Sequence, residues 1–276
     1  MKEIFKSILK TVHLYHPLQS FYRNVLSNLK KIYLRIIYQR YRGAEFTCNF
    51  CQHSYARFVP DYPSKENAAA ITKNAVIAGY GENIFCPYCL STARERLVKS
   101  MLEQIQLSKK KILHLSPEKK IYHFLIDKAE VITADLSPLF YKSIDKNVIK
   151  ADATNLSFKD ETFDLVIANH ILEHIPDDHK AMREIFRVLK KNGTTILQVP
   201  YSEKISNTIE DLTIDDARKQ SELFGQKDHV RIYNLSDYIQ RLKNSGFIVE
   251  YVPYHALSDF YQFAIQRDEG FFKITK

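Results

Sequence analysis

Two pairs of cysteines carry the clearest chemistry in this chain. Each pair has the spacing Cys-x2-Cys, and residues 52–85 separate the two pairs. A turn of this kind places two thiolates on one side of the backbone, and two such turns complete the tetrahedral coordination of Zn²⁺. Because four thiolates leave no open coordination position, we expect a structural metal, the alternative being thiols without a metal. The predicted ligands are Cys48, Cys51, Cys86 and Cys89, with His53 as a spare candidate.

Two aspartates end apolar stretches that are typical of buried strands. Asp135 closes the stretch that begins at Val131, and Asp152 closes the next stretch, at 148–152. In a parallel α/β sheet, an acid at the end of the second strand can accept hydrogen bonds from both hydroxyls of a ribose. Asp152 and the backbone of Ala153 are placed to meet an adenine amino group. The alternative for both aspartates is a simple cap on the end of a strand.

Asn169 and His170 follow the apolar run 165–168. His170 is the first candidate for a catalytic base, since the pKa of an imidazole lies close to neutral pH. Asn169 is a candidate cofactor contact. The alternative is that His170 only packs beside a bound cofactor.

A second candidate group lies in the segment 225–233. Asp228 stands next to His229, which predicts a histidine base that a carboxylate orients. Arg231 and Tyr233 are predicted to bind the acceptor, because a guanidinium group can grip a carboxylate or a phosphate. The alternative is a set of hydrogen bonds that only orders the loop.

Apolar periodicity predicts the elements that position these side chains. The unbroken run 165–168 is typical of a strand buried on both faces of a parallel sheet. Asp177 and Asp178 open a helix that Gly193 is expected to end. The next strand follows at once, and this strand–helix–strand unit favours a right-handed crossover. Strands are expected near 111–115, 131–135, 148–152, 163–168, 194–199, 247–253 and 260–266, with a helix at 236–244.

The chain divides into three predicted parts. Residues 1–43 form a basic helical arm that Pro17 interrupts, residues 44–92 carry the cysteines, and residues 93–276 form the α/β domain. The arm holds nine Lys and Arg residues against Glu3 alone, so its charge of +8 equals that of the whole chain. No apolar run reaches the roughly 20 residues that cross a bilayer, and no signal peptide is recognisable. We therefore expect a cytoplasmic chain.

The arm is predicted to be amphipathic. A helix that is rich in Lys and Arg and lacks acids can lie on an anionic membrane surface. It can equally grip RNA phosphates, or pack on the rest of the chain with its lysines in solvent. We favour peripheral contact with the inner face of a membrane over binding to nucleic acid. The predicted apolar stripe consists of Val25, Leu29, Ile32, Tyr33, Ile36 and Ile37.

Four stretches together resemble a bacterial family of class I S-adenosylmethionine (SAM)-dependent methyltransferases with an N-terminal zinc-knuckle segment. They are CPYCLSTARERL, ILHLSPE, the ADATNLSF block with FDLVIANHILEHIPDD, and LFGQKDHVRIY, within residues 44–267. The loop after the first strand departs from the general pattern of these enzymes, because it contains no glycine. In the family that the chain resembles, a His-x-x-Pro-Glu loop replaces the glycine loop. The resemblance implies that the methionine part of SAM is lined by His114, Ser116, Pro117 and Glu118.

The resemblance also implies the fold and the activity. The expected fold is an α/β, Rossmann-like sheet of seven mostly parallel strands with helices on both faces, plus a small four-cysteine zinc segment and the basic arm. The expected cofactors are SAM and a structural zinc ion. We expect O-methylation of a small-molecule or glycan acceptor, namely a saccharide or glycolipid in cell-surface polysaccharide biosynthesis. The alternatives are an RNA methyltransferase with a zinc ribbon and a non-catalytic scaffold that has lost SAM.

Overall fold

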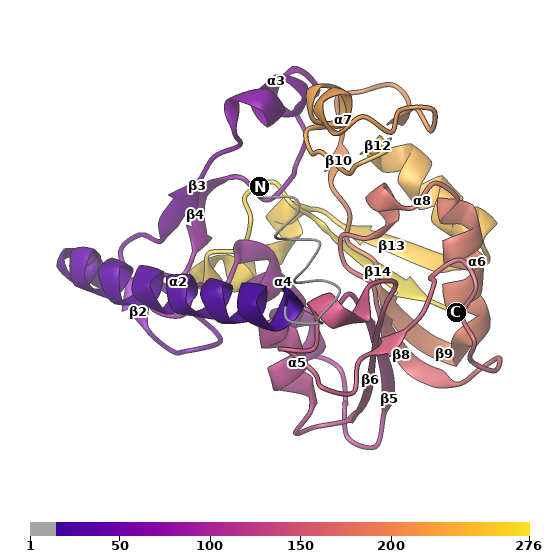
Figure 1. Cartoon of the computed structure of the whole chain (residues 1–276), viewed down its shortest axis with the longest axis horizontal. Coiled ribbons are helices and arrows are strands. Elements are labelled where there is room, and N and C mark those ends of the chain that lie inside the picture. Colours follow the sequence, from indigo (N-terminus) through magenta and orange to yellow (C-terminus); the bar gives the residue numbers. More distant parts are fainter. Residues whose placement is uncertain (1–14) are drawn as a thin grey trace.

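The computed structural model describes residues 15–276 (Figure 1), so the part of the predicted arm at 1–14 lies outside the described residues. Seven strands form the central sheet in the order β13-β14-β9-β8-β5-β6-β7. Neighbouring strands run parallel except for β14, which is antiparallel to both β9 and β13. The predicted seven-stranded, mostly parallel sheet is confirmed. Its strands are β5 (Lys111–Leu115), β6 (Glu130–Asp135), β7 (Ile149–Lys150), β8 (Phe163–Ile167), β9 (Leu189–Ile196), β13 (Ile248–Val252) and β14 (Phe271–Thr275).

Helices cover both faces of this sheet, which explains the apolar run in β8. Side chains of β8 alternate between two cores, so that Val166 packs into one and Leu165 and Ile167 pack into the other. The first core lies under α6 (Asp178–Val188) and α8 (Leu235–Asn244). The second lies under α4 (Ala93–Leu102), α5 (Lys119–Leu125) and the 3-10 helix η4 (Tyr254–Phe263).

Two element boundaries differ from the sequence-based expectation. The stretch 260–266 is no strand, because η4 occupies most of it and Ile265 packs into the core under α4. The last strand is β14, which begins five residues further on. Helix α6 is capped by the Asp177 carboxylate, which accepts a hydrogen bond from the Lys180 N–H at 2.9 Å. It ends at Val188 rather than at Gly193, because Leu189 already pairs with Phe163 in the sheet.

A cap lies over the carboxyl end of the sheet. Its first half is α3 (Lys65–Lys73), and its second half contains α7 (Ala217–Phe224), which contacts α3 (Figure 1). Ile77 forms a bridge with Tyr201, and the Ser202 hydroxyl donates to the Asn74 carbonyl at 2.5 Å. Segments that are far apart in the sequence therefore meet above the strand ends. The remaining strands are β1 (Arg42–Thr47) with β2 (Ser54–Tyr55), β3 (Val59–Asp61) with β4 (Gly81–Phe85), and β10 (Tyr201–Ser202), β11 (Ile209–Glu210) and β12 (Arg231–Asn234).

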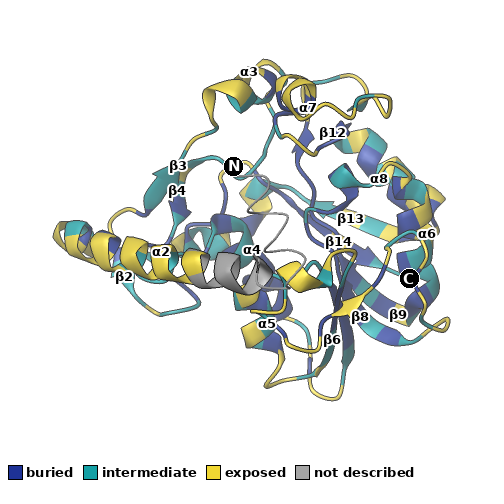
Figure 2. Cartoon of the chain, viewed as in Figure 1, coloured by how far each residue is buried: buried dark blue, intermediate teal, exposed yellow. Residues whose placement is uncertain are grey.

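Helix α2 (Tyr15–Ile37) forms most of the described part of the arm. Pro17 lies in its first turn, where proline is tolerated because that N–H has no intrahelical partner, so it does not interrupt the described helix. Leu34 packs against the cysteine segment, together with Tyr38 just after the helix. Figure 2 shows that most of the described helix surface is exposed. Its exposed apolar side chains are Tyr22, Val25, Leu26, Leu29, Ile32, Tyr33 and Ile36.

The predicted amphipathic pattern is therefore present, but its apolar stripe faces away from the body of the chain. Among residues 15–276, no helix is both long and apolar enough to cross a membrane.

Candidate metal centre, cofactor pocket and acceptor cavity

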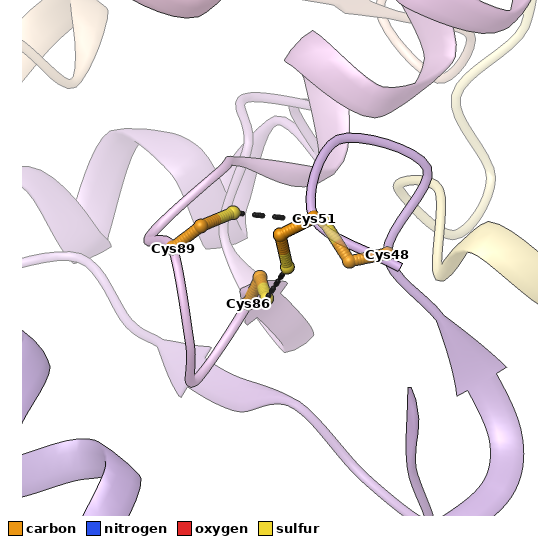
Figure 3. A group of neighbouring side chains, drawn as sticks. All are labelled: Cys48, Cys51, Cys86 and Cys89. Atoms are coloured by element: carbon orange, nitrogen blue, oxygen red, sulfur yellow. Dashed lines mark hydrogen bonds between the residues drawn. The ribbon is translucent and has the colours of Figure 1, made fainter. Parts of the chain in front are cut away.

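The four cysteines converge on one point (Figure 3). The sulfur atoms of Cys48 and Cys89 lie 3.6 Å apart, and those of Cys51 and Cys86 lie 3.7 Å apart. In a tetrahedral site with Zn–S bonds of about 2.3 Å, sulfur atoms are separated by about 3.8 Å. All four cysteines are free, and Cys48 and Cys86 are completely buried. This donor set fits a structural zinc ion.

Both halves of the tetracysteine site have the same backbone. The N–H groups of Gln52 and Leu90 donate to the carbonyls of Cys48 and Cys86, at 2.8 and 2.9 Å. Gln52 and Leu90 both adopt positive φ angles, of 60° and 61°. The CxxC spacing thus closes two equivalent knuckles, although neither has glycine at the position that needs a left-handed conformation. His53 stacks on the Tyr88 ring and contributes no ligand to the group.

Thiols at these distances share protons. The hydrogen bond with Cys51 lowers the pKa of the Cys48 thiol to about 6, and the same contact raises the pKa of Cys51. A divalent cation removes this conflict, because it binds all four groups as thiolates.

Arg96 of α4 ties the metal centre to the α/β domain. It is buried, and its guanidinium donates to the carbonyls of Ser91, Phe263 and Ala264 at 2.6 Å each. It also donates to the carbonyls of Asn83 and Ile84. Five carbonyls from two segments of the chain therefore depend on one side chain.

The glycine-free loop after β5 still makes the turn that a cofactor needs. Ser116 takes a left-handed conformation, with φ at 47°, where glycine is usually found. Its hydroxyl donates to the Asp135 carboxylate at 2.6 Å, and the other carboxylate oxygen accepts from the Ser137 N–H at 2.6 Å. Both residues line a pocket of 520 Å³, a volume within the usual range for cofactor sites.

The far end of this cofactor pocket is formed by the segment after β7. Asp152 and Ala153 line it, as predicted for the adenine end. The backbone N–H and the hydroxyl of Thr154 both donate to one oxygen of Asp152 at 2.8 Å, and these bonds lower the pKa of Asp152. Asp152 therefore stays ionised and keeps its other oxygen for a donor.

A second compartment, of 340 Å³, extends the cofactor pocket towards α4. Glu118 and Asn169 line it, and the Asn169 amide donates to Glu118 at 3.1 Å. His114 is completely buried and holds Glu118 through its Nε2 at 2.6 Å. Pro117 is also buried and lines neither compartment. Of the four loop residues that we expected to line the methionine end, Ser116 and Glu118 face the pocket, whereas His114 only positions Glu118.

Arg94 is a pocket residue that the sequence did not single out. Its Nε lies 3.7 Å from the buried Glu269, and its Nε and Nη2 have no hydrogen-bond partner in the described part of the chain. Thr92 and Glu95 form a capping box that starts α4 and fixes Arg94 in its first turn. Nothing local in the sequence distinguishes Arg94 from Arg96, because their different surroundings come from residues about 170 positions away.

His170 joins the compartments. It lines the 520 Å³ pocket, the 340 Å³ compartment and a smaller cavity of 140 Å³ beneath the cap, which we call the acceptor cavity. Its φ is 52°, and both ring nitrogens lack hydrogen-bond partners among residues 15–276. Burial lowers the pKa of His170 well below its usual value. An unprotonated imidazole therefore borders all three spaces.

His229 lines the acceptor cavity, but Asp228 does not orient it. The Asp228 carboxylate lies 3.6 Å from His174 Nδ1 and accepts from Gln226. His229 is buried and contacts the His174 ring edge-on, and burial lowers the pKa of His229 to about 3. The predicted Asp228–His229 pair is thus corrected to an Asp228–His174 contact.

Arg231 and Tyr233 support the loop between β8 and α6. The Arg231 guanidinium donates to Glu210 at 2.9 Å and to the carbonyls of Leu172, Ile175 and Pro176, so all of its nitrogens are engaged. Tyr233 is completely buried. Its hydroxyl donates to the Asp178 carboxylate at 2.7 Å. Both side chains therefore support this loop, the alternative that the sequence had left open, while Arg231 also lines the acceptor cavity and its acceptor-binding role stays a prediction.

Comparison with known proteins agrees with this geometry. The model of a family described as "Methyltransferase domain" matches residues 119–197. The ubiquinone/menaquinone biosynthesis C-methyltransferase UbiE of Pasteurella multocida is 30% identical over 41% of this chain and 46% of its own length. The uncharacterized methyltransferase YcgJ of Bacillus subtilis is 31% identical over 31% of this chain and 32% of its own length. The chain thus spans less than half of these curated relatives.

Among solved structures, a SAM-dependent methyltransferase from Mesorhizobium loti is similar, with a TM-score of 0.47 and 16% identity over 67% of this chain and 97% of that one. The family match lies within the α/β region, and the strand order observed here is the one expected of a class I SAM-dependent methyltransferase domain.

Proposed function

We propose that this chain transfers a methyl group from SAM to an oxygen atom of a saccharide or glycolipid acceptor. The observation that carries the proposal is the position of His170, which lines both compartments of the cofactor pocket and the acceptor cavity. A base at such a junction reaches the atom that receives the methyl group. The polar lining of the acceptor cavity, including Tyr80, Arg94 and Glu173, supports a hydroxylated acceptor.

Different residues of the cofactor pocket bind different parts of SAM. Asp135 accepts from the ribose hydroxyls, and Asp152 with the backbone of Ala153 meets the adenine. Glu118 attracts the ammonium group of the methionine part, and Arg94 attracts its carboxylate. When bound, SAM supplies a methyl group activated by a sulfonium.

The residues around the acceptor cavity prepare the acceptor oxygen. His170 takes the proton of the attacking hydroxyl, because its burial leaves the imidazole unprotonated at neutral pH. Helices α3 and α7 close the cavity from above and keep water out.

The exposed surface of helix α2 favours an acceptor that is linked to a lipid. Its seven exposed apolar side chains are not covered by any other part of the chain within residues 15–276, and its sequence contains four basic residues and no acid. Apolar side chains can enter the boundary of a bilayer, and Lys and Arg residues can meet anionic headgroups. Arg35 does not serve this purpose, because its Nε donates to the Tyr88 carbonyl at 3.1 Å. We therefore propose that α2 lies on an anionic membrane surface.

Vesicle binding tests this second part of the proposal. The chain should sediment with vesicles of anionic phospholipid and not with zwitterionic ones. Replacing Leu29 and Ile36 by serine should abolish sedimentation, whereas Leu223→Ser, at an exposed position on α7, should leave it unchanged. Equal sedimentation of the α2 variant and the parent chain would contradict the membrane role.

Methyl transfer is tested with labelled SAM and three acceptor fractions: lipid-linked glycans, free saccharides and RNA. We expect label in a glycan fraction and a large loss of label with His170→Ala. Label in RNA alone would contradict the saccharide proposal and favour the RNA methyltransferase. Binding of SAM without transfer to any fraction would favour a different acceptor class, and absence of SAM binding would favour the scaffold.

A further inference from the structure

A second group of metal-ligating side chains lies at the acceptor cavity, apart from the tetracysteine site. One carboxylate oxygen of Glu173 and one ring nitrogen each of His174 and His229 lie within 4.8 Å of one another. Glu173 and His174 belong to the 3-10 helix η3 (Leu172–His174), and His229 precedes β12. All three residues line the acceptor cavity, and His174 also lines the cofactor pocket.

Glu173 is a buried carboxyl group with an unsatisfied oxygen at the acceptor cavity. Its side chain is only 1% exposed, and its Oε2 has no hydrogen-bond partner among residues 15–276. His170 Nδ1 lies 3.8 Å from Oε1, beyond hydrogen-bond distance. A buried carboxylate is costly unless it is paired or coordinates a metal.

Both histidines are held as metal-binding histidines usually are. His174 Nδ1 lies 3.0 Å from the carbonyl oxygen of Asp228, and the ring of His229 is hydrogen-bonded to the backbone of Phe224. Histidines that bind metals typically place one ring nitrogen on a backbone carbonyl, which fixes the tautomer and leaves the other nitrogen as ligand. Each histidine here keeps one such nitrogen.

The two segments that supply these ligands are fixed to each other. The Val230 N–H donates to the Glu173 carbonyl at 2.9 Å, and Arg231 binds three carbonyls of the loop that follows β8. The three side chains are therefore brought together before any ion binds, which lowers the entropic cost of binding.

We propose that Glu173, His174 and His229 bind one divalent transition-metal ion at the acceptor cavity. Two imidazoles and a carboxylate suit ions such as Zn²⁺ or Fe²⁺ better than Mg²⁺ or Ca²⁺, which prefer oxygen ligands. Three protein ligands leave a coordination position open, in contrast to the closed tetracysteine site. Metal binding itself does not depend on the proposed methyl transfer. Only the ion's role there, as a holder of the acceptor oxygen, rests on that function.

Zinc content tests the proposal on the full chain. After equilibration with Zn²⁺ and removal of unbound metal, elemental analysis should find two zinc ions per chain. Glu173→Gln, which keeps the shape of the side chain, and His229→Asn should each reduce the content to one. His123→Asn, an exposed histidine on α5, should retain two. One zinc ion in the parent chain, or two in the Glu173→Gln variant, would overturn the proposal.

Cobalt spectra separate the two sites if a variant is hard to purify. The first equivalent of Co²⁺ should give the intense thiolate charge-transfer band of a tetracysteine site. The second should add weaker visible bands without further charge transfer, and these should be absent in Glu173→Gln and in His174→Asn. A second equivalent that adds no bands to the parent spectrum would contradict the site. These readouts do not involve SAM, so failure of methyl transfer and failure of metal binding can be told apart.

Discussion

The tetracysteine centre and the Glu173–His174–His229 group are both sets of metal-ligating side chains, but the chain builds them in different ways. Each half of the first is a local turn in which Cys48 and Cys51, or Cys86 and Cys89, are three positions apart. The second depends on tertiary contacts that bring His229 to a loop more than 50 positions earlier. The first has four charged ligands and no open position, whereas the second borders a cavity. This comparison predicts a structural metal at the first centre and, at the second, the accessible metal site proposed above.

Removal of a cysteine should have the largest effect. Cys86→Ser leaves three thiols, of which Cys48 is buried, around a weakened zinc site, so we expect a loss of zinc and a destabilisation of about 4 kcal/mol or more. Chemical denaturation and elemental analysis measure both quantities. His53→Ala is the matched control, because His53 stacks on Tyr88 beside the site without binding it. If His53→Ala also lost the metal, the four-cysteine ligand set would be wrong.

Two arginines on α4 test the difference between a residue that holds the fold and a residue that lines the cofactor pocket. Arg96→Met removes a hydrogen-bond donor from five carbonyls, of which that of Ser91 keeps the Cys86 N–H as another donor, so the free energy of unfolding should fall by about 3–5 kcal/mol. Arg94→Met should cost less, about 1–3 kcal/mol, because Arg94 loses only its 3.7 Å ion pair with the buried Glu269, while its Nε and Nη2 make no hydrogen bond among residues 15–276. It should also weaken SAM binding about tenfold or more.

Urea denaturation and calorimetry of both arginine variants provide the readout. Equal loss of stability in both variants would show that Arg94 is a structural residue like Arg96.

Substitutions of Ser116 separate backbone strain from hydrogen bonding in the cofactor loop. Ser116→Ala removes the hydroxyl that contacts Asp135 and keeps the strained positive φ. Ser116→Gly removes the same hydroxyl but relieves the strain, by about 1 kcal/mol. Calorimetry should therefore show weaker SAM binding in both variants. In thermal unfolding, the Ser116→Gly variant should be more stable than the Ser116→Ala variant. The reverse ranking would contradict the left-handed conformation of the loop.

The smallest effect is expected at the zinc knuckle. Gln52→Gly should stabilise the chain by about 0.5 kcal/mol or less, because glycine adopts the positive φ of this position without strain but removes the hydrogen bond from Gln52 Nε2 to the Asn49 carbonyl. Thermal unfolding measures the shift. Gln104→Gly is the control, since Gln104 follows the end of α4 and is not among the residues with positive φ. A stabilisation of equal size in both variants would exclude knuckle strain as its cause.

Local patterns predicted the sheet and the cysteine cluster because their causes lie within a few residues. The run 165–168 alternates between two cores, and the CxxC spacing by itself closes a knuckle. The strand expected at 260–266 was misplaced because its apolar residues pack against α4 rather than into the sheet. In the same way, the charged residues around Arg231 in the sequence did not reveal that its guanidinium donates hydrogen bonds to three carbonyls and to Glu210.

The parts of the site that sequence reasoning missed depend on distant partners. Arg94 faces the cofactor pocket only because α4 packs beside Glu269 and His170. Glu173 is a potential ligand only because the segment before β12 lies against it. Neither neighbour is visible in a window of adjacent residues, whereas Asp135 and Asp152 were found because strand ends of a parallel sheet share one edge.

The most direct test of the account is calorimetric titration of SAM into the zinc-loaded chain, beside Asp135→Ala and the control Asp127→Ala. Asp135 lines the pocket and Asp127 is exposed at the end of α5, so both variants remove one carboxylate from the same domain. We expect one SAM per chain for the parent and for Asp127→Ala, with binding lost in Asp135→Ala. Absence of SAM binding to folded, zinc-loaded parent chain would contradict the methyltransferase proposal and favour a scaffold that kept only the fold.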